Sequence, residues 1–140
     1  MGRFTAREIE YLQSHRLARL ATVNSVGELH VVPIAFFYNP KEETIDIGGH
    51  GFTTSKKYRD ALRHGRVAIV VDDVAERGNP RMVEVRGTVQ ALATGGDAIN
   101  PAAPPEIIRI TPTYIVSMGV NDDEVRPAHG SVHFDGRRVK

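Results

Sequence analysis

Residues 17–38, LARLATVNSVGELHVVPIAFFY, hold the pattern that decides the fold of this 140-residue chain. Residues 17–23 and 30–38 are rich in aliphatic and aromatic residues, which favours strands. Residues 24–28 supply turn formers between them, so the stretch predicts an antiparallel hairpin. Pro33 lies inside the second strand. Because proline donates no ladder hydrogen bond, we expect a bulge or an interrupted sheet edge there.

Four further segments are expected to form strands: 44–48, 66–71, 82–92 and 107–116. Residues 82–92 alternate between apolar and polar side chains with a period of two. Pro112 again indicates a bulge or bend. Six short strands, mostly in hairpin order, predict a mainly β barrel or sandwich. A barrel this small fills its own interior, so a large ligand would bind outside it or between subunits.

Two short helices complete the expected fold. Residues 5–8, TARE, have the spacing of a capping box, so a helix is expected over residues 5–14. In a second helix, Tyr58 and Leu62 share one apolar face, and Gly65 is the expected C-terminal stop.

The remaining segments are polar or lack periodicity. Residues 72–80 and 94–105 are interpreted as loops, and the paired acids at the start of the first loop as solvated charge. Residues 121–140 are interpreted as a mobile polar tail behind a domain formed by residues 1–120. The basic end of that tail, residues 137–140, is expected to be solvated.

The composition excludes several classes of function. A net charge of +1 gives no overall field that would recruit nucleic acid, and the absence of cysteine excludes disulfides and thiolate metal sites. No apolar run approaches the roughly 18–20 residues of a membrane span, and no signal peptide is evident, so we expect a cytoplasmic protein without a membrane partner. His129 and His133 have helical spacing, but no third ligand is evident, so no metal site is expected.

Residues 47–59, IGGHGFTTSKKYR, carry the clearest candidate binding motif. A strand runs into glycines, three hydroxyl residues follow, and Lys56 and Lys57 fall at the expected first turn of a helix. Lysine is mildly unfavourable at that end of the helix dipole, whereas an anion is favoured there. The segment is therefore either a phosphate or carboxylate site or a glycine turn with solvated lysines. His50 is either a hydrogen-bond donor to a cofactor or a turn residue.

The ordered set of motifs resembles the pyridoxamine 5'-phosphate oxidase-like split β-barrel family, over roughly residues 4–120. The matching residues are 17–23, Gly27, 30–34, 48–60, Asp72, Asp73, 83–87 and 108–117. They are most similar to the branch that uses the deazaflavin coenzyme F420. The resemblance implies a six-stranded split barrel of the FMN-binding type. It also implies a homodimer with cofactor at the subunit interface.

The resemblance also implies the cofactor contacts. The ring would lie against backbone groups of the second strand at Val32, Pro33, Ile34 and Ala35. The phosphate and acidic tail would meet Thr54, Ser55, Lys56 and Lys57, with Gly49 and His50 beside them. No side chain is an evident general acid, so the catalytic residues stay unassigned.

The chain departs from the family in two ways. It has no tryptophan and lacks the substrate-binding pair of the vitamin oxidases, so pyridoxamine oxidation is not expected, and Met118 stands where deazaflavin relatives often carry tryptophan. Residues 94–105 are short where larger relatives place a helix, which favours an open substrate pocket.

The implied activity is an F420-dependent oxidoreductase that transfers hydride to an activated double bond of a small or polycyclic organic substrate. One alternative is an FMN-dependent reductase or oxidase of the same fold. The other is a non-catalytic flavin or deazaflavin carrier, and binding of heme ranks below both.

Overall fold

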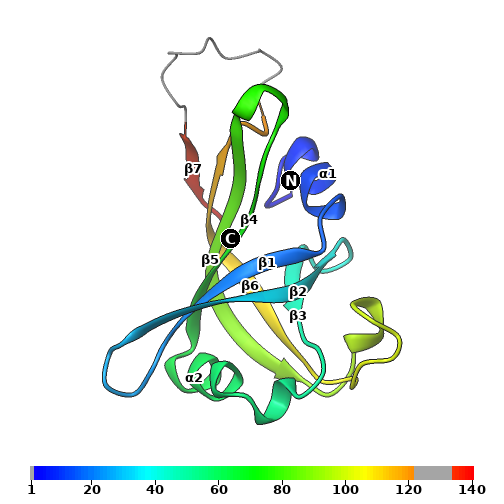
Figure 1. Ribbon diagram of the computed structural model, residues 1–140, viewed down its shortest axis with the longest axis vertical. Helices are drawn as coiled ribbons and strands as arrows, with labels where there is room; N and C mark the ends of the chain where they lie inside the picture. The colour runs from blue at the N-terminus through cyan, green and yellow to red at the C-terminus, as the bar shows by residue number, and fades with distance from the viewer. Residues whose placement is uncertain (1, 122–133) are drawn as a thin grey trace.

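The computed structural model describes residues 2–121 and 134–140, and these residues form seven strands and two α-helices (Figure 1). The helices are α1 (Ala6–Gln13) and α2 (Lys56–His64), with single 3₁₀ turns at η1 (Phe52–Thr54), η2 (Glu76–Gly78) and η3 (Gly96–Ala98). The strands are β1 (Leu17–Val23), β2 (Leu29–Asn39), β3 (Thr44–Ile47), β4 (Arg66–Val74), β5 (Pro80–Leu92), β6 (Ile107–Met118) and β7 (Phe134–Arg138).

Strands β1 to β6 form one closed antiparallel barrel. Neighbours follow the order β3-β2-β1-β4-β5-β6, and β3 pairs with β6 to close the ring. β5 occupies one edge of β6, and the other edge is shared by β3, near its start, and β7, near its end. The structure therefore confirms the expected six-stranded split barrel and adds a seventh strand.

β3 covers only part of β2. β2 has eleven residues and β3 has four, and the two strands pair from Phe36 to Asn39. Among the described residues, the edge of Leu29–Ala35 that faces away from β1 has no strand partner. The Phe36 N–H donates to the carbonyl of Arg16 (3.3 Å), so Phe36 faces β1 and, by alternation, Pro33 faces the free edge. The proline thus removes no ladder bond, which confirms the interrupted edge.

Pro112 sits at a β-bulge, as its position within a strand predicts. Arg86 pairs with Tyr114, but the next residue, Gly87, pairs with Pro112, so Thr113 is the extra residue on β6. A Cβ on Gly87 would collide with a backbone carbonyl oxygen of β6. Glycine is therefore required where the bulge brings the two backbones together.

Both helices follow their sequence signals. The Thr5 hydroxyl accepts the Glu8 N–H (3.1 Å) and the Glu8 carboxylate accepts the Thr5 N–H (2.9 Å), which completes the expected capping box. Gly65 ends α2 with a positive φ of 83°, and Tyr58 and Leu62 pack against the core. The barrel interior is filled by buried aliphatic side chains, among them Leu20, Ile45, Ile47, Ile69, Val83, Val85, Ile108, Ile110 and Ile115.

The expected loop over residues 72–80 is wrong at both ends. β4 continues to Val74 and β5 starts at Pro80, and these two residues are register partners. Asp73 pairs across the strands with Arg81, whose guanidinium donates to both carboxylate oxygens (2.8 and 2.5 Å). An ion pair between cross-strand neighbours extends the hairpin, so the acid is not a solvated loop charge.

The expectation of a mobile tail is also wrong where the structure describes it, although Arg138 and Lys140 are exposed, as expected for the basic end. Residues 134–138 form β7, antiparallel to β6, and Val139 packs against the core. Arg137 reaches the fully buried Glu8 with two hydrogen bonds, of 2.5 and 3.1 Å. The rest of the tail, residues 122–133, lies outside the described residues, and the division of the chain at residue 120 stays a prediction.

Glu8 is a buried carboxylate that depends on this partner. Burial alone would raise the pKa of Glu8, but hydrogen bonds from Arg137, Thr5 and Ser117 outweigh it and lower the pKa below its ordinary value. The Ser117 hydroxyl donates at 2.7 Å. The C-terminal strand therefore neutralises a charge that α1 places inside the protein.

We expect Arg137→Ala to lower the free energy of unfolding by about 3–5 kcal/mol, because it leaves the Glu8 carboxylate buried without its cation. Arg138→Ala is the matched control, since this exposed neighbour only lies over the ring of Tyr114 (6.0 Å) and its loss should cost about 1 kcal/mol or less. Urea unfolding of both variants measures the difference. Equal effects would contradict the role given to Arg137.

Candidate cofactor and substrate site

The free edge of β2 offers backbone rather than side chains. Val32 and Ile34 point into the barrel, where Ile34 is buried and Val32 packs against the core, whereas Pro33 and Ala35 are exposed on the outer face. By the alternation set at Phe36, the Ala35 N–H and the carbonyls of Pro33 and Ala35 point out of the free edge. These groups are unpaired donors and acceptors that a planar ring with polar edges can use.

The segment after β3 leaves the sheet beside this edge. Ile47 is the register partner of Phe36, so the residues after Ile47 continue on the side of β2 that β3 does not cover. Figure 1 shows the two diverging there, with β2 running to its hairpin and the chain after β3 descending to α2. Gly49 (φ 139°) and Gly51 (φ 66°) permit this turn, and His50 is exposed between them.

The hydroxyl residues of this segment are used within the chain. Thr54 donates to the carbonyl of Gly51 (3.0 Å), and Ser55 donates to the carbonyl of Phe52 (2.6 Å). Ser55 also caps α2 by accepting the Tyr58 N–H (3.3 Å). The first-turn N–H groups of Lys56 and Lys57 have no intrahelical acceptor, so they are the free donors at this end of the helix.

The two lysines differ in their surroundings. Lys56 donates to Asp60 (2.9 Å), a nearly buried carboxylate that also pairs with Arg63 (3.0 Å). The hydrogen bond from Lys56 is the largest cause of the lowered pKa of Asp60. Lys57 lies 6.0 Å from the ring centre of Phe52 and has no carboxylate partner among the described residues. Lys56 therefore has an internal partner that the sequence interpretation missed, and Lys57 is the cation left for an external anion.

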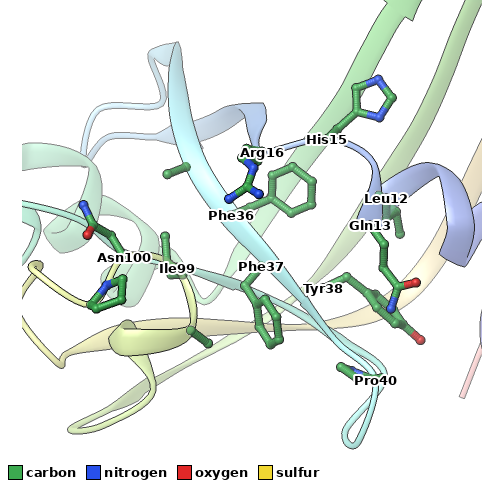
Figure 2. A pocket seen from close by; sticks show the side chains of 13 residues that line it. Leu12, Gln13, His15, Arg16, Phe36, Phe37, Tyr38, Pro40, Ile99 and Asn100 are labelled. Atoms are coloured by element: carbon green, nitrogen blue, oxygen red, sulfur yellow. The ribbon is translucent and has the colours of Figure 1, made fainter.

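A groove of about 660 Å³ adjoins the free edge at Ala35. Its walls are the end of α1 with the α1–β1 connection, the C-terminal half of β2, and the turn at η3 (Figure 2). Leu12, Gln13, His15, Arg16, Ala35, Phe36, Phe37, Tyr38, Pro40, Ala98, Ile99, Asn100 and Pro101 line it. The sequence predicted the open connection at residues 94–105, but it predicted none of the residues that form the opposite wall of the groove.

A polar cluster holds the α1–β1 connection in place. The His15 Nε2 lies 2.8 Å from Asp73 Oδ2, and the Tyr11 hydroxyl donates to Asp73 Oδ1 (3.0 Å). The hydrogen bond from Arg81 is the largest cause that lowers the pKa of Asp73 to about 2, and those from His15 and Tyr11 add to it. The carboxylate of β4 thus fixes the chain just before Arg16.

The outer face of the sheet carries exposed apolar side chains between charged ones such as Arg19 and Glu84. Large exposed side chains that share this face by register are Leu17, Leu29, Val31, Val74 and Phe134, each 55–78% exposed. Strands that are apolar on both faces are typical of sheets covered on both sides. In the sequence, Leu29 and Val31 alternate with the residues of β2 that face the core, and this pattern could have indicated exposed apolar side chains on the outer face.

Two expected absences concern the described residues alone. Within residues 2–121 and 134–140, no group of three or more His, Asp or Glu side chains could hold a metal ion, and His129 and His133 lie outside them. In the same part of the chain, no helix has the length and apolar character needed to cross a bilayer.

The chain is similar to a curated enzyme and to solved structures. It is 43% identical over 122 residues to the 5a,11a-dehydrotetracycline/5a,11a-dehydrooxytetracycline reductase of Streptomyces rimosus, which covers 86% of each chain. A pyridoxamine 5'-phosphate oxidase-related, FMN-binding protein from Nostoc punctiforme matches all of this chain and 98% of its own (TM-score 0.63, 10% identity). An FAD-binding protein from Mycobacterium smegmatis matches 81% and 93% (TM-score 0.60, 22% identity). No family model matches the chain.

The closed barrel, the partly covered β2 and these similarities define the class of the protein. The chain belongs to the pyridoxamine 5'-phosphate oxidase-like split β-barrel family, in the group of the dehydrotetracycline reductase. The similarities support an oxidoreductase of the flavin-binding split-barrel kind, as the sequence motifs indicate.

Asp73→Asn should lower stability at neutral pH, and the difference from the unchanged protein should shrink as the pH falls from about 4 towards 2. The folded-state pKa of about 2 lies below the ordinary 3.8, so the stabilisation is complete above the ordinary value and is lost as the pH falls through the folded one. Thermal unfolding across this range measures it. Asp72→Asn is the control, because Asp72 is 41% exposed and its ion pair with Arg19 is long, at 3.6 Å. A pH-independent difference for Asp73→Asn would refute the account.

Proposed function

We propose that the protein is a reductase that uses reduced coenzyme F420 to transfer hydride to an activated carbon–carbon double bond of a polycyclic organic substrate. The observation that carries the proposal is the 43% identity to a dehydrotetracycline reductase over most of both chains. The free edge of β2 and Lys57 at the start of α2 would supply the two contacts that such a cofactor needs.

The residues present fit a tricyclic ring with a phosphate tail. The unpaired backbone groups at Pro33 and Ala35 match the polar edge of the ring, whereas the N–H and carbonyl groups of Val32 and Ile34 face β1, so these two residues would only line the ring's position along the strand. The α2 N-terminus with Lys57 fits the phosphate, since N–H donors and a point charge both favour an anion there. When bound, reduced F420 supplies the hydride; the chain orients ring and substrate and excludes water.

The site as proposed includes Gly49, His50, Thr54, Ser55 and Lys56 around the phosphate tail. Thr54 and Ser55 donate their hydroxyl hydrogens within the chain, which leaves only oxygen lone pairs on these hydroxyls. The role of the two residues is therefore to shape the turn and to hold the N–H donors in position. Lys56 shapes the same helix through Asp60 and adds charge at longer range.

A second candidate is an FMN-dependent reductase or oxidase, favoured by the FMN-binding neighbour of the same fold. The ring and phosphate contacts above serve either cofactor. A carrier that binds the cofactor without turnover uses the same contacts but no substrate groove.

We further propose a cytoplasmic homodimer with the cofactor at the subunit interface. The exposed outer face of the sheet is the surface that a second copy would cover, because Leu17, Leu29, Val31, Val74 and Phe134 are exposed on it. Burying such side chains is favourable by about 25 cal/mol per Å². Leu29 and Val31 belong to the free-edge half of β2, so the interface would border the ring.

The function is tested by mixing the purified protein with reduced F420 and a dehydrotetracycline, and following the absorbance of oxidised F420. We expect the oxidised cofactor to form in step with the reduced product, and no turnover with FMN and a nicotinamide reductant. Turnover with FMN and the nicotinamide reductant, but not with reduced F420, would support the second candidate. Tight F420 binding without turnover would leave only the carrier.

Lys57→Ala should weaken binding of oxidised F420 about tenfold or more, the effect of losing a charge-assisted contact to phosphate. Lys56→Ala is the matched control, and we expect a smaller loss because Asp60 already neutralises this lysine. Fluorescence titration of the cofactor gives both dissociation constants. The assignment fails if Lys56→Ala has the larger effect.

Val31→Asp should convert the dimer to a monomer and weaken cofactor binding, because a carboxylate would be buried in the apolar face. Val26→Asp is the control, since Val26 is also exposed (76% against 67%) but lies in the β1–β2 turn. Light scattering measures the mass and cofactor titration the affinity. A monomeric unchanged protein would rule out the interface site.

A further inference from the structure

We propose that the groove between α1, β2 and η3 is the substrate site, and that Arg16 binds an ionised enol or phenol oxygen of a planar polycyclic substrate lying against Phe37. The inference rests on the proposed reductase function for its reaction, but the groove and its charge are properties of the chain itself.

Arg16 is the cation that the groove leaves available. Its side chain is exposed and makes no hydrogen bond or ion pair with any described residue, although its backbone carbonyl is used by Phe36. The residues that line the groove include no Asp or Glu, so no carboxylate within it competes for this guanidinium. A guanidinium without a partner in the described chain favours an anionic oxygen.

The rest of the groove suits a flat, weakly polar ring system. Phe37, partly buried on β2, offers an aromatic surface, and Ile99 lies on the facing turn. Gln13 and Asn100 carry amide donors with no partner in the described chain; the Asn100 Oδ1 accepts the Ala102 N–H (3.0 Å), which leaves its Nδ2 free. Figure 2 shows Arg16, Phe37 and Asn100 around the groove from three separate segments.

The walls are held before any ligand arrives. On one side, His15 is fixed by Asp73 (2.8 Å) and the Arg16 carbonyl by the Phe36 N–H (3.3 Å). On the other side, the Gly96 N–H donates to the carbonyl of Pro105 (2.9 Å) and the Asn100 N–H to that of Gly96 (3.0 Å). A groove with fixed walls loses less entropy on binding, which favours recognition of a rigid ring system.

The groove adjoins both halves of the proposed cofactor site. Ala35 belongs to the groove and to the free edge of β2. Ile99 packs towards Gly48, where a Cβ would lie 3.4 Å from the Ile99 methyl group, and Gly48 leads directly into the proposed phosphate segment. A ring system in the groove would therefore lie beside the ring on β2, as hydride transfer requires.

The test is calorimetric titration with tetracycline, a stable tetracyclic enol, in buffer with EDTA and without cofactor. We expect binding by the unchanged protein, a roughly tenfold or greater loss in Arg16→Gln, and an intermediate affinity in Arg16→Lys. Arg59→Gln is the matched control, because Arg59 is exposed on α2 outside the groove and should not change the affinity. Phe37→Leu should also weaken the binding of tetracycline. The affinity for F420 should be unchanged in Arg16→Gln and in Phe37→Leu.

The outcomes separate this inference from the proposed function. No binding of tetracycline, or equal binding by Arg16→Gln and the unchanged protein, overturns the groove assignment, even if the protein reduces dehydrotetracyclines. Arg16-dependent binding supports the groove, even if reduced F420 is never oxidised, a result that would overturn the proposed reductase alone.

Discussion

The unequal lengths of β2 and β3 are the constraint on which the rest of the site depends. A four-residue strand cannot cover an eleven-residue neighbour, so Leu29–Ala35 keeps one edge free among the described residues. Unpaired backbone groups at a sheet edge must be satisfied by solvent or by another molecule. Pro33 is tolerated there because it faces the open edge, and the glycine-rich segment leaves the sheet next to this edge because Ile47 pairs with Phe36.

The charged clusters around Glu8 and Asp73 hold structural elements in place rather than bind ligands. Glu8 with Arg137 ties α1 to the last strand, and Asp73 with His15 ties the end of α1 to the β4–β5 hairpin. The Glu8 carboxylate is fully buried, and breaking a buried ion pair is costly even where the pair adds little net stability, so this pair favours a single arrangement of α1 and β7. The result of the two clusters is a fixed connection that presents Arg16 to the groove.

The sequence was most informative where a local pattern determines the structure. The hairpin with Pro33, the capping box at residues 5–8 and the alternation of residues 82–92 each depend on neighbouring residues, and each was confirmed. β7 was missed because its ion pair is remote in the chain: Arg137 and Glu8 are separated by 129 positions. The ion pair of Asp73 was missed although Arg81 is only eight positions away, because the two become neighbours only once β4 and β5 extend as a hairpin.

The candidate site divides in the same way. The segments 32–35 and 49–57 were identified by resemblance. The structure shows that the second segment follows β3, whose last residue pairs with Phe36, and the contacts of both segments with a cofactor stay a prediction. Arg16 and Phe37 carry no motif, since their meaning depends on a groove built from three distant segments. The neutralisation of Lys56 has a local signal, an acid four residues on, that the dipole argument outweighed.

The central claim is that the uncovered edge of β2 is the seat of the redox ring. A crystal structure of the protein with oxidised F420 tests it most directly. The account predicts the deazaflavin ring against the backbone of residues 32–35 and the phosphate at the N-terminus of α2 beside Lys57. A ring bound elsewhere, with the edge of Leu29–Ala35 paired to another strand, would contradict it.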